Sequence, residues 1–280
     1  MAAVLARSRT IELRHGAIRL AIEPERGGRV TAFERDGRAI FRTAEVGRDP
    51  LGASLFAMVP WPNRIANGRF AWRGRTVVLP VNHRAASADH PIHGLGWQAA
   101  WSVVERSATA AILRYAYRGG AWPWPFAATQ TLTVEPGGYE HMLALTNLSD
   151  EAMPAGLGLH PYFPRDGATM TRAFPTRSRM GADELPLAPQ AWNAPPPMRP
   201  QDDCYASARE PIVLTWPDCR VVIEPDAAFG HTHVYVPEGE PFFCVEPVSH
   251  PPDAANRGGL RALDPGETWT TRTRFRVEAA

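Results

Sequence analysis

Apolar and polar residues alternate with a period of two along much of this chain. Ile18, Leu20 and Ile22 are separated by polar or small residues, and the same spacing recurs over residues 111–117. Over residues 269–277, apolar and threonine side chains face one way and three arginines face the other. Because successive side chains of a strand point to opposite faces, this pattern predicts antiparallel sheets with one face against a core.

Turn-forming pairs separate the strand-like runs at short intervals and favour tight hairpins. They are Asp36-Gly37, Arg73-Gly74, Gly137-Gly138, Pro217-Asp218 and Glu238-Gly239. Helical periodicity is scarce, and the 28 prolines would interrupt long helices almost anywhere. We therefore expect an all-β, antiparallel sandwich or barrel with little helix, at most one short helical turn.

One segment differs from the rest of the chain in composition and in hydrophobic pattern. Residues 165–200 are rich in proline and poor in alternation, which predicts a long loop that crosses the sandwich. Strands of the earlier character resume at Ile212, so the segment does not read as a domain linker. A β-sandwich commonly reaches about 200–250 residues, and we expect residues 1–280 to form a single domain.

Composition excludes several classes of protein. Lys and Arg number 30 against 29 Asp and Glu, a net charge of +1 that gives no reason to expect a nucleic-acid partner. The N-terminal apolar patch is too short for a signal peptide, and no window approaches the ~18 apolar residues of a membrane span. We therefore expect a cytoplasmic protein without membrane contact. Cys204, Cys219 and Cys244 lack metal-site spacing, which favours reduced, structural thiols.

Two loops carry polar groups that suit ligand binding. Residues 60–70 form a rigid, proline-rich loop that offers the amide of Asn63 beside the guanidinium of Arg64. A surface arginine is the simpler alternative. Further along, His93 precedes Gly94 and lies near Trp97. The alternative there is a loop histidine hydrogen-bonded to the backbone.

Three further positions stand next to apolar strands. His160 ends a strand of small residues, where a buried core histidine is the alternative reading. Asp202 and Asp203 follow the proline-rich segment, where an Asx turn would suffice. Glu246 follows the apolar run of residues 242–245. A carboxylate in that position is paired, turned to solvent, or kept with a raised pKa for proton transfer.

A metal site is a further alternative. His231 and His233 fall on the same face of a strand, and Glu238 follows, a spacing similar to cupin metal sites. However, Glu238-Gly239 fits hairpin chemistry, and no later histidine is clearly placed on a neighbouring strand. The chain also has no Gly-x-Ser-x-Gly elbow, no activated cysteine and no phosphate-binding glycine loop.

Taken in order, these segments resemble the aldose 1-epimerase (galactose mutarotase) family. The matching motifs are Asn63-Arg64-Ile65 with Gly68 and Phe70, Ile92-His93-Gly94, His160-Pro161-Tyr162-Phe163, and Cys244-Val245-Glu246-Pro247 followed by Pro252-Asp253-Ala254 and Asn256. The likeness extends to residues 79–82 and 122–126. Four motifs in the family's order make the resemblance specific, although each alone is weak.

The resemblance implies a single-domain β-supersandwich, galactose mutarotase-like and free of cofactor and metal, that interconverts the α and β anomers of a free hexose. Glu246 would be the general base at the anomeric hydroxyl, and His160 the general acid at the ring oxygen. Partial burial would raise the pKa of Glu246, while nearby carboxylates would keep His160 protonated. The partner is the sugar alone, with the protein a monomer or a weak homodimer.

The resemblance also implies a set of sugar-binding residues. The side chains that would hold the sugar are those of Arg64, His93, Asp202, Asn63 and Trp97. Aromatic rings offer apolar faces for stacking on the sugar, unless they belong to the core. The rings in question are those of Trp61, Trp97, Trp122 and Tyr162.

The chain departs from the better-known members in its sugar-contacting loops. It has Pro164-Arg165 after the His160 motif, Leu95 after Gly94, and Asp202-Asp203 in place of an Asp-His pair. Asp202 aligns with the family aspartate because Tyr205 then takes the aromatic position, with Asp203 as the alternative. These departures leave open a hexose-6-phosphate mutarotase, in which Arg165 or another loop arginine meets the phosphate, or a non-catalytic sugar-binding sandwich.

Overall fold

A computed structural model of the chain describes residues 10–45, 47, 49–206 and 210–279. Within these residues the chain forms sheets of 11 and 8 strands and two smaller sheets of two strands each. In this described part of the chain, helix is confined to α1 (Ala254–Arg257) and the 3-10 turns η1 (Pro50–Gly52), η2 (Ala66–Gly68) and η3 (Gly96–Gln98). The prediction of an antiparallel all-β chain with little helix is confirmed.

The strands of the 11-stranded sheet are, in spatial order, β1 (Ile11–His15), β2 (Ile18–Glu23), β3 (Arg29–Arg35), β5 (Leu55–Met58), β13 (Gly158–Pro164), β21 (Phe242–Val248), β20 (His231–Val236), β17 (Gln201–Ala206), β15 (Phe174–Arg179) and β16 (Gln190–Ala194), with β4 (Arg38–Ala39) beside β3. Those of the 8-stranded sheet are β14 (Thr169–Met170), β18 (Ile212–Thr215), β19 (Cys219–Pro225), β23 (Thr268–Ala279), β11 (Gly138–Asn147), β10 (Phe126–Glu135), β9 (Ala110–Tyr117) and β8 (Ser102–Arg106). The small sheets pair β12 (Met153–Ala155) with β22 (Arg261–Leu263), and β6 (Arg69–Trp72) with β7 (Arg75–Val78).

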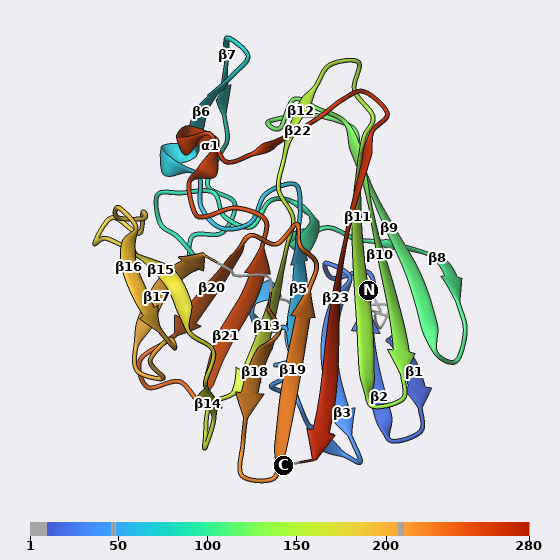
Figure 1. Cartoon of the computed structure of the whole chain (residues 1–280). Helices are drawn as coiled ribbons and strands as arrows, with labels where there is room; N and C mark the ends of the chain where they lie inside the picture. Colours follow the sequence, from blue (N-terminus) through green and yellow to red (C-terminus); the bar gives the residue numbers. More distant parts are fainter. Residues whose placement is uncertain (1–9, 46, 48, 207–209, 280) are drawn as a thin grey trace, which may run out of the picture.

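The two large sheets lie face to face and enclose an apolar core that includes residues from Ile11 to Val277 (Figure 1). Aromatic rings fill much of this core. Trp61 and Trp122, two of the candidates for sugar stacking, are 1% and 0% exposed and stack on each other with centroids 4.9 Å apart. These two rings therefore belong to the core.

The predicted turns connect the expected strands. Asp36-Gly37 closes the β3–β4 hairpin and Arg73-Gly74 closes β6–β7, with positive φ at all four residues. Such backbone angles suit two-residue hairpins whose twist matches the flanking strands. The predicted alternation along β23 is also confirmed, since its odd-numbered residues from 269 to 277 are buried and its arginines are exposed.

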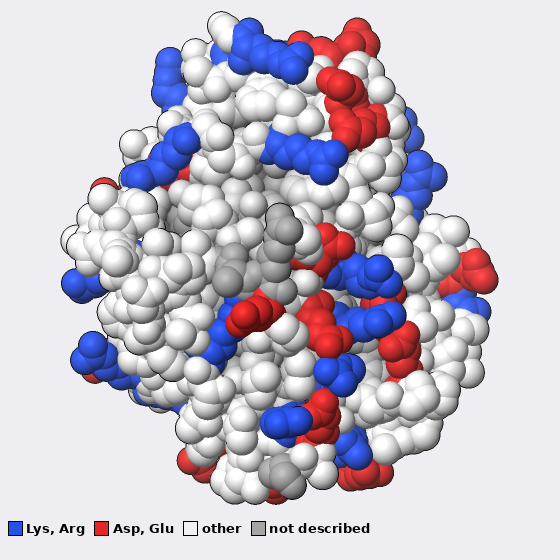
Figure 2. Space-filling view, in the orientation of Figure 1, with Lys and Arg blue, Asp and Glu red and all other residues white. Residues whose placement is uncertain are grey.

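Acidic residues pair with the arginines on the outer side of β23. Arg274 Nε lies 2.8 Å from Glu140 Oε2, and Arg276 NH2 lies 2.9 Å from Glu224 Oε1. Figure 2 shows basic and acidic side chains interleaved over this face. Exposed pairs of this kind stabilise a protein only slightly, and their main consequence is a surface of mixed charge.

The prediction of a long loop over residues 165–200 is wrong in part. The segment contains β14, β15 and β16, and the last two extend the edge of the 11-stranded sheet. Pro175 falls where the β15–β16 register shifts, so no ladder hydrogen bond is required of it. β16 is an edge strand that pairs on one side only. Bulges and edges tolerate proline, which is why alternation was a poor guide here.

The strands at the centre of the 11-stranded sheet are buried on both faces. On β21, Phe243 and Val245 point into the core between the sheets, while Cys244 and Val248 belong to a second apolar cluster. That second cluster also contains Phe56 and Met58 of β5, and residues of the 51–53 and 92–97 segments cover this outer face of the sheet. The covered face explains why the strand before Glu246 is apolar throughout.

All three cysteines, Cys204, Cys219 and Cys244, are free and buried, in agreement with the expectation of reduced structural thiols. None of the helices among the described residues has the length or apolar character needed to cross a membrane.

Candidate active site

A row of side chains crosses five neighbouring strands on the covered face of the large sheet. Cys204 of β17 pairs with His233 of β20, and His233 pairs with Glu246 of β21. The register of the next pair places His160 of β13 level with Glu246, and His160 pairs with Phe56 of β5. Because paired residues point to the same face of a sheet, this register brings the two predicted catalytic residues together.

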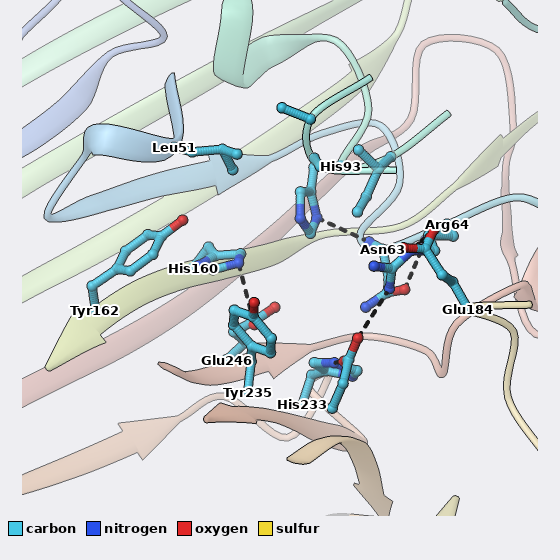
Figure 3. A pocket seen from close by; sticks show the side chains of 14 residues that line it. Leu51, Asn63, Arg64, His93, His160, Tyr162, Glu184, His233, Tyr235 and Glu246 are labelled. Carbon is cyan, nitrogen blue, oxygen red and sulfur yellow. Dashed lines mark hydrogen bonds and ion pairs between the residues drawn. The ribbon is translucent and has the colours of Figure 1, made fainter. Parts of the chain in front are cut away.

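His160 and Glu246 are in direct contact. His160 Nε2 lies 3.3 Å from Glu246 Oε1, and the two residues are 5% and 1% exposed (Figure 3). The imidazole ring packs against Phe56 and Tyr162, whose ring centroids lie 4.6 Å and 4.7 Å away. Glu246 Oε2 has no protein partner among the described residues. The pair is held rigidly and leaves one buried carboxyl oxygen for an incoming ligand.

Burial governs the protonation of this pair. It raises the pKa of Glu246 to about 8, as the sequence predicted, because a charged carboxylate is poorly solvated there. It also lowers the pKa of His160 to about 3, and the nearby positive charges of His233 and Arg42 add to this effect. The expectation of a protonated His160 in the free protein is therefore wrong, because burial disfavours the charged form of the ring. At neutral pH the pair holds one proton, which resides mainly on Glu246.

The loop of residues 63–68 brings Arg64 to the site. The backbone N–H of Asp253 donates to the carbonyl oxygen of Arg64 at 2.9 Å, and Asp253 Oδ1 accepts from Ala66 N at 2.9 Å. Asn63 adopts a positive φ and caps its neighbour, since its Oδ1 accepts from Arg64 N at 2.9 Å. The Asp253 motif therefore braces the Arg64 loop, and both Asn63 and Arg64 line the cavity.

His93 is held by a second braced loop. The side chain of Asn82 bonds to Ile92 N, Ile92 O and Gly94 O at 2.8–2.9 Å. Gly94 is required there, because a Cβ atom would lie 2.0 Å from the carbonyl oxygen of Val59. His93 Nδ1 accepts from Asn63 N at 3.3 Å, which leaves the proton on Nε2. Burial lowers the pKa of His93 well below its usual value, so the ring is neutral.

Trp97 does not line the cavity. Its ring is 1% exposed and packs against His93 in an edge-on contact, with centroids 5.5 Å apart. The indole N–H donates to Gly94 O at 3.2 Å. The expectation that Trp97 contacts a sugar directly is therefore wrong. Burial on the covered face makes Trp97 a support for the His93 loop.

The two adjacent aspartates point to opposite faces of β17. Asp202 lines the cavity, where its Oδ2 lies 3.5 Å from Arg64 NH1 and its Oδ1 lies 2.5 Å from His233 Nε2. Asp203 is 3% exposed and accepts from Arg177 Nε at 2.8 Å. The structure thus places Asp202 in the cavity with His160 and Glu246, as preferred from the sequence. Asp203 points away from it.

The cavity has a volume of about 280 Å³, which is at the small end for ligand sites in proteins. Its lining residues are Leu51, Asn63, Arg64, Ala85, Ala86, Ile92, His93, His160, Tyr162, Glu184, Asp202, His233, Tyr235 and Glu246. Tyr162, a candidate for stacking, is among them. Glu184 and Tyr235 were not predicted from the sequence, and His233 was considered only as part of an alternative metal site.

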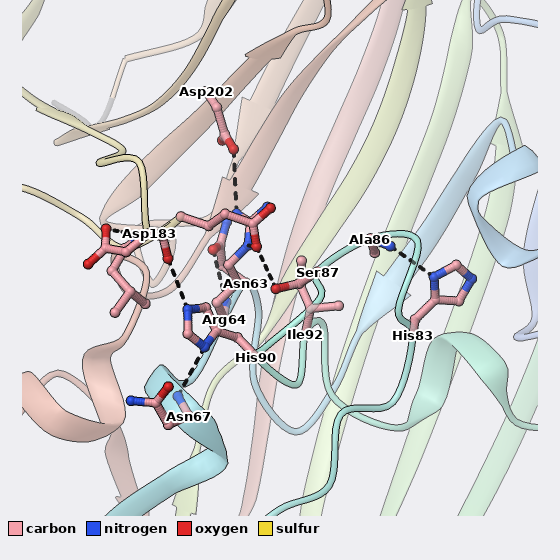
Figure 4. A network of polar contacts seen from close by, with 12 residues as sticks. Asn63, Arg64, Asn67, His83, Ala86, Ser87, His90, Ile92, Asp183 and Asp202 are labelled. Carbon is pink, nitrogen blue, oxygen red and sulfur yellow. Dashed lines mark hydrogen bonds and ion pairs between the residues drawn. The ribbon is translucent and has the colours of Figure 1, made fainter.

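A polar network joins the loops that form the cavity walls (Figure 4). His90 Nδ1 accepts from Asn67 N at 3.0 Å, and its Nε2 contacts Asp183 O at 2.9 Å. Ser87 Oγ donates to Glu184 Oε2 at 2.7 Å, and Glu184 Oε2 lies 3.4 Å from Arg64 Nε. Three loops far apart in the sequence are thereby held as one wall around Arg64.

The alternative metal site of His231, His233 and Glu238 does not form. His233 is bonded to Asp202, whereas His231 lines a separate cavity and Glu238 is an exposed turn residue. Within the described chain, the His160, Cys244 and Glu246 ligand atoms lie within 4.8 Å of one another. Burial raises the pKa of the Cys244 thiol well above its usual value, and metal binding would require the thiolate. The donor set is thus poorly suited to a resident cation.

Comparisons with known proteins identify the fold and the family of the chain. The chain is 30% identical over 297 positions to the uncharacterized protein YphB of Escherichia coli K12, covering 95% of this chain and 98% of that protein. An E. coli K12 crystal structure provisionally described as an aldose 1-epimerase superposes with a TM-score of 0.90 at 27% identity, covering 97% of this chain and 99% of that one.

A galactose mutarotase-like protein from Clostridium acetobutylicum shares the fold at 19% identity, with a TM-score of 0.84 and coverage of 97% and 95% of the two chains. This fold is the galactose mutarotase-like one that the sequence predicted. The sequence model of the aldose 1-epimerase family matches residues 9–276. The chain belongs to the aldose 1-epimerase family.

Proposed function

We propose that this protein is a mutarotase that interconverts the α and β anomers of a free hexose. The observation that carries the proposal is the contact of 3.3 Å between His160 and Glu246 at the base of a polar cavity. Anomerisation needs one proton removed and one proton delivered at two oxygens bonded to the same carbon. Two proton-transfer groups in contact can reach both oxygens at once.

In the proposed reaction, Glu246 takes the proton from the anomeric hydroxyl and His160 protonates the ring oxygen. The bond between the anomeric carbon and the ring oxygen breaks and an aldehyde forms. Rotation about the C1–C2 bond turns the aldehyde, and ring closure on its other face returns both protons. Each positioned acid or base contributes on the order of 10²–10⁴ to the rate. Arg64, His93 and Asp202 hold the remaining hydroxyls.

The single proton of the pair is what the reaction requires. The free protein keeps it mainly on Glu246, whereas the proposed first step starts with Glu246 ionised and His160 protonated. Transfer across the 3.3 Å contact converts one form into the other without a proton from solvent. The two titrations belong to the pair, because the two sites interact strongly.

The proton count predicts the pH dependence of kcat/KM. Above about pH 8 the pair loses its remaining proton and no acid is left. Below about pH 3 both groups are protonated and no base is left. We expect a plateau between these limits and a tenfold fall per pH unit on the alkaline side. Exchange NMR at pH 5–10 measures it, and a rate that keeps rising through pH 9 would contradict it.

The charges in the cavity favour a neutral sugar over a phosphorylated one. Arg64 contacts both Glu184 and Asp202, and His233 contacts Asp202, so each cation of the described lining already has an acidic partner. A phosphate would have to displace these partners. Arg165 donates to Pro237 O and Met198 O and does not line the cavity.

A direct comparison of substrates tests the proposal. Saturation-transfer NMR on glucose, galactose and their 6-phosphates, each at the same concentration, reports the exchange rate between anomers. We expect acceleration for at least one free hexose and a kcat/KM at least tenfold lower for its 6-phosphate. A preference for the phosphorylated sugars would support the hexose-6-phosphate alternative instead.

A further inference from the structure

His233 occupies a position that the proposed reaction does not yet use. It is 3% exposed, and it lies directly across from Glu246 in the β20–β21 register. Paired residues of neighbouring strands have Cβ atoms ~5 Å apart, so the imidazole and the carboxyl group are close neighbours. Both reach the cavity from adjacent strands (Figure 3).

We propose that His233 is a positioning residue that keeps a positive charge beside Glu246, so that the carboxylate can form inside a buried cavity. This role rests on the proposed mutarotase function and adds a third member to its proton machinery. A buried carboxylate without a nearby cation is costly, and the described lining offers few cations. Arg64 is shared between two other acids, which leaves His233 as the cation across from Glu246.

Asp202 makes the charge on His233 stable. Its Oδ1 lies 2.5 Å from His233 Nε2, a short distance typical of a charge-assisted hydrogen bond. Burial by itself lowers the pKa of His233, but the bond and charge of Asp202, with the Cys204 thiol and Glu246, raise it well above its usual value. The same contact lowers the pKa of Asp202 against the effect of its burial.

Groups from every neighbouring element act on this ring. They are Asp202 and Cys204 of β17, Glu246 of β21, His160 of β13, Arg64 of the 63–68 loop and His93 of the 92–94 loop. The negative charge of Asp202 favours the imidazolium, and Arg64, which contacts the same aspartate, opposes it. His160 and His93 are neutral in the free protein because burial lowers the pKa of each.

A His233→Gln variant separates charge from hydrogen bonding, since the amide still donates to Asp202 but carries no charge. Loss of a unit charge at this range displaces a titration by roughly one to two pH units. We expect the alkaline limb of kcat/KM to move to higher pH by at least one pH unit. We also expect kcat at pH 7 to fall at least tenfold, because less Glu246 ionises, while KM changes little.

A role limited to orienting Asp202 would leave the limb in place and raise KM, and that result would overturn the proposal. His231→Gln is the matched control, because His231 lies on the same strand and face but outside the catalytic cavity. The alkaline limb of kcat/KM for His231→Gln should stay at the same pH as in the unmodified protein.

Nitrogen-15 NMR of the histidine rings gives a test that needs neither a folded variant nor turnover. In the unmodified protein we expect His233 to be imidazolium at pH 7, and a neutral ring there would overturn the proposal. If no sugar is anomerised although His233 is charged, the mutarotase function fails while the charge assignment stands.

Discussion

A Glu246→Gln variant is expected to lose anomerisation activity by about 10³-fold in kcat, within the range of a positioned general base. The amide has nearly the shape of the carboxyl group but can neither take a proton nor hold the one that the pair shares. Sugar binding should persist within a few-fold, because Arg64, His93 and Asp202 are untouched. Exchange NMR measures the rate, and calorimetric titration with the same sugar measures binding.

Glu238→Gln is the matched control, since Glu238 is an exposed carboxylate in the turn between β20 and β21. It should retain full activity. The non-catalytic alternative gives a different pattern. If Glu246→Gln and the unmodified protein bind the sugar equally and show the same rate of anomerisation, the protein is a sugar-binding sandwich.

Replacement of His160 by alanine should lower kcat by a factor of about 10²–10⁴ and leave a cavity shaped like the lost ring. Phe56 and Tyr162 both pack against that ring in stacked contacts, and His93 meets it edge-on. Added imidazole can therefore occupy the vacated space and carry the proton. We expect imidazole to raise the anomerisation rate of the variant at least tenfold, and this increase should saturate with imidazole concentration.

The rescue must be specific to the missing ring. Imidazole should not accelerate the Glu246→Gln variant, and it should not alter His15→Gln, whose histidine is an exposed residue at the end of β1. Equal acceleration of all three proteins would mean that imidazole acts in bulk solution, and the assignment of His160 as the acid would then lose its support.

Local periodicity was sufficient to predict most of the fold, because the alternation of apolar and polar residues within a strand indicates which of its faces is buried. β23 is the clearest case, since exposed and buried residues alternate without a break from Thr268 to Val277. The failure over residues 165–200 has a physical cause. Bulges need fewer ladder hydrogen bonds, so β15 tolerates Pro175, and the other prolines of the segment lie outside β14, β15 and β16.

The site was predictable only where a residue belongs to a local motif. Glu184 had no such signal: it lies in the proline-rich segment, has a positive φ, and meets Arg64 from 120 positions away in the sequence. The alternation of His231 and His233 was visible, but the partner of His233 is Asp202, on a strand that precedes it. Burial of Trp97 likewise depends on residues distant in the sequence, since Phe56 and His83 pack against its ring.

The most direct test of the mutarotase assignment is the rate of exchange between the anomers of a free hexose in the presence of the purified protein, measured by saturation-transfer NMR across a panel of sugars at pH 7. We expect at least one sugar to exchange in proportion to protein concentration, at a rate that Glu246→Gln reduces to the level of buffer. Exchange no faster than in buffer for every sugar, with a correctly folded protein, would contradict it.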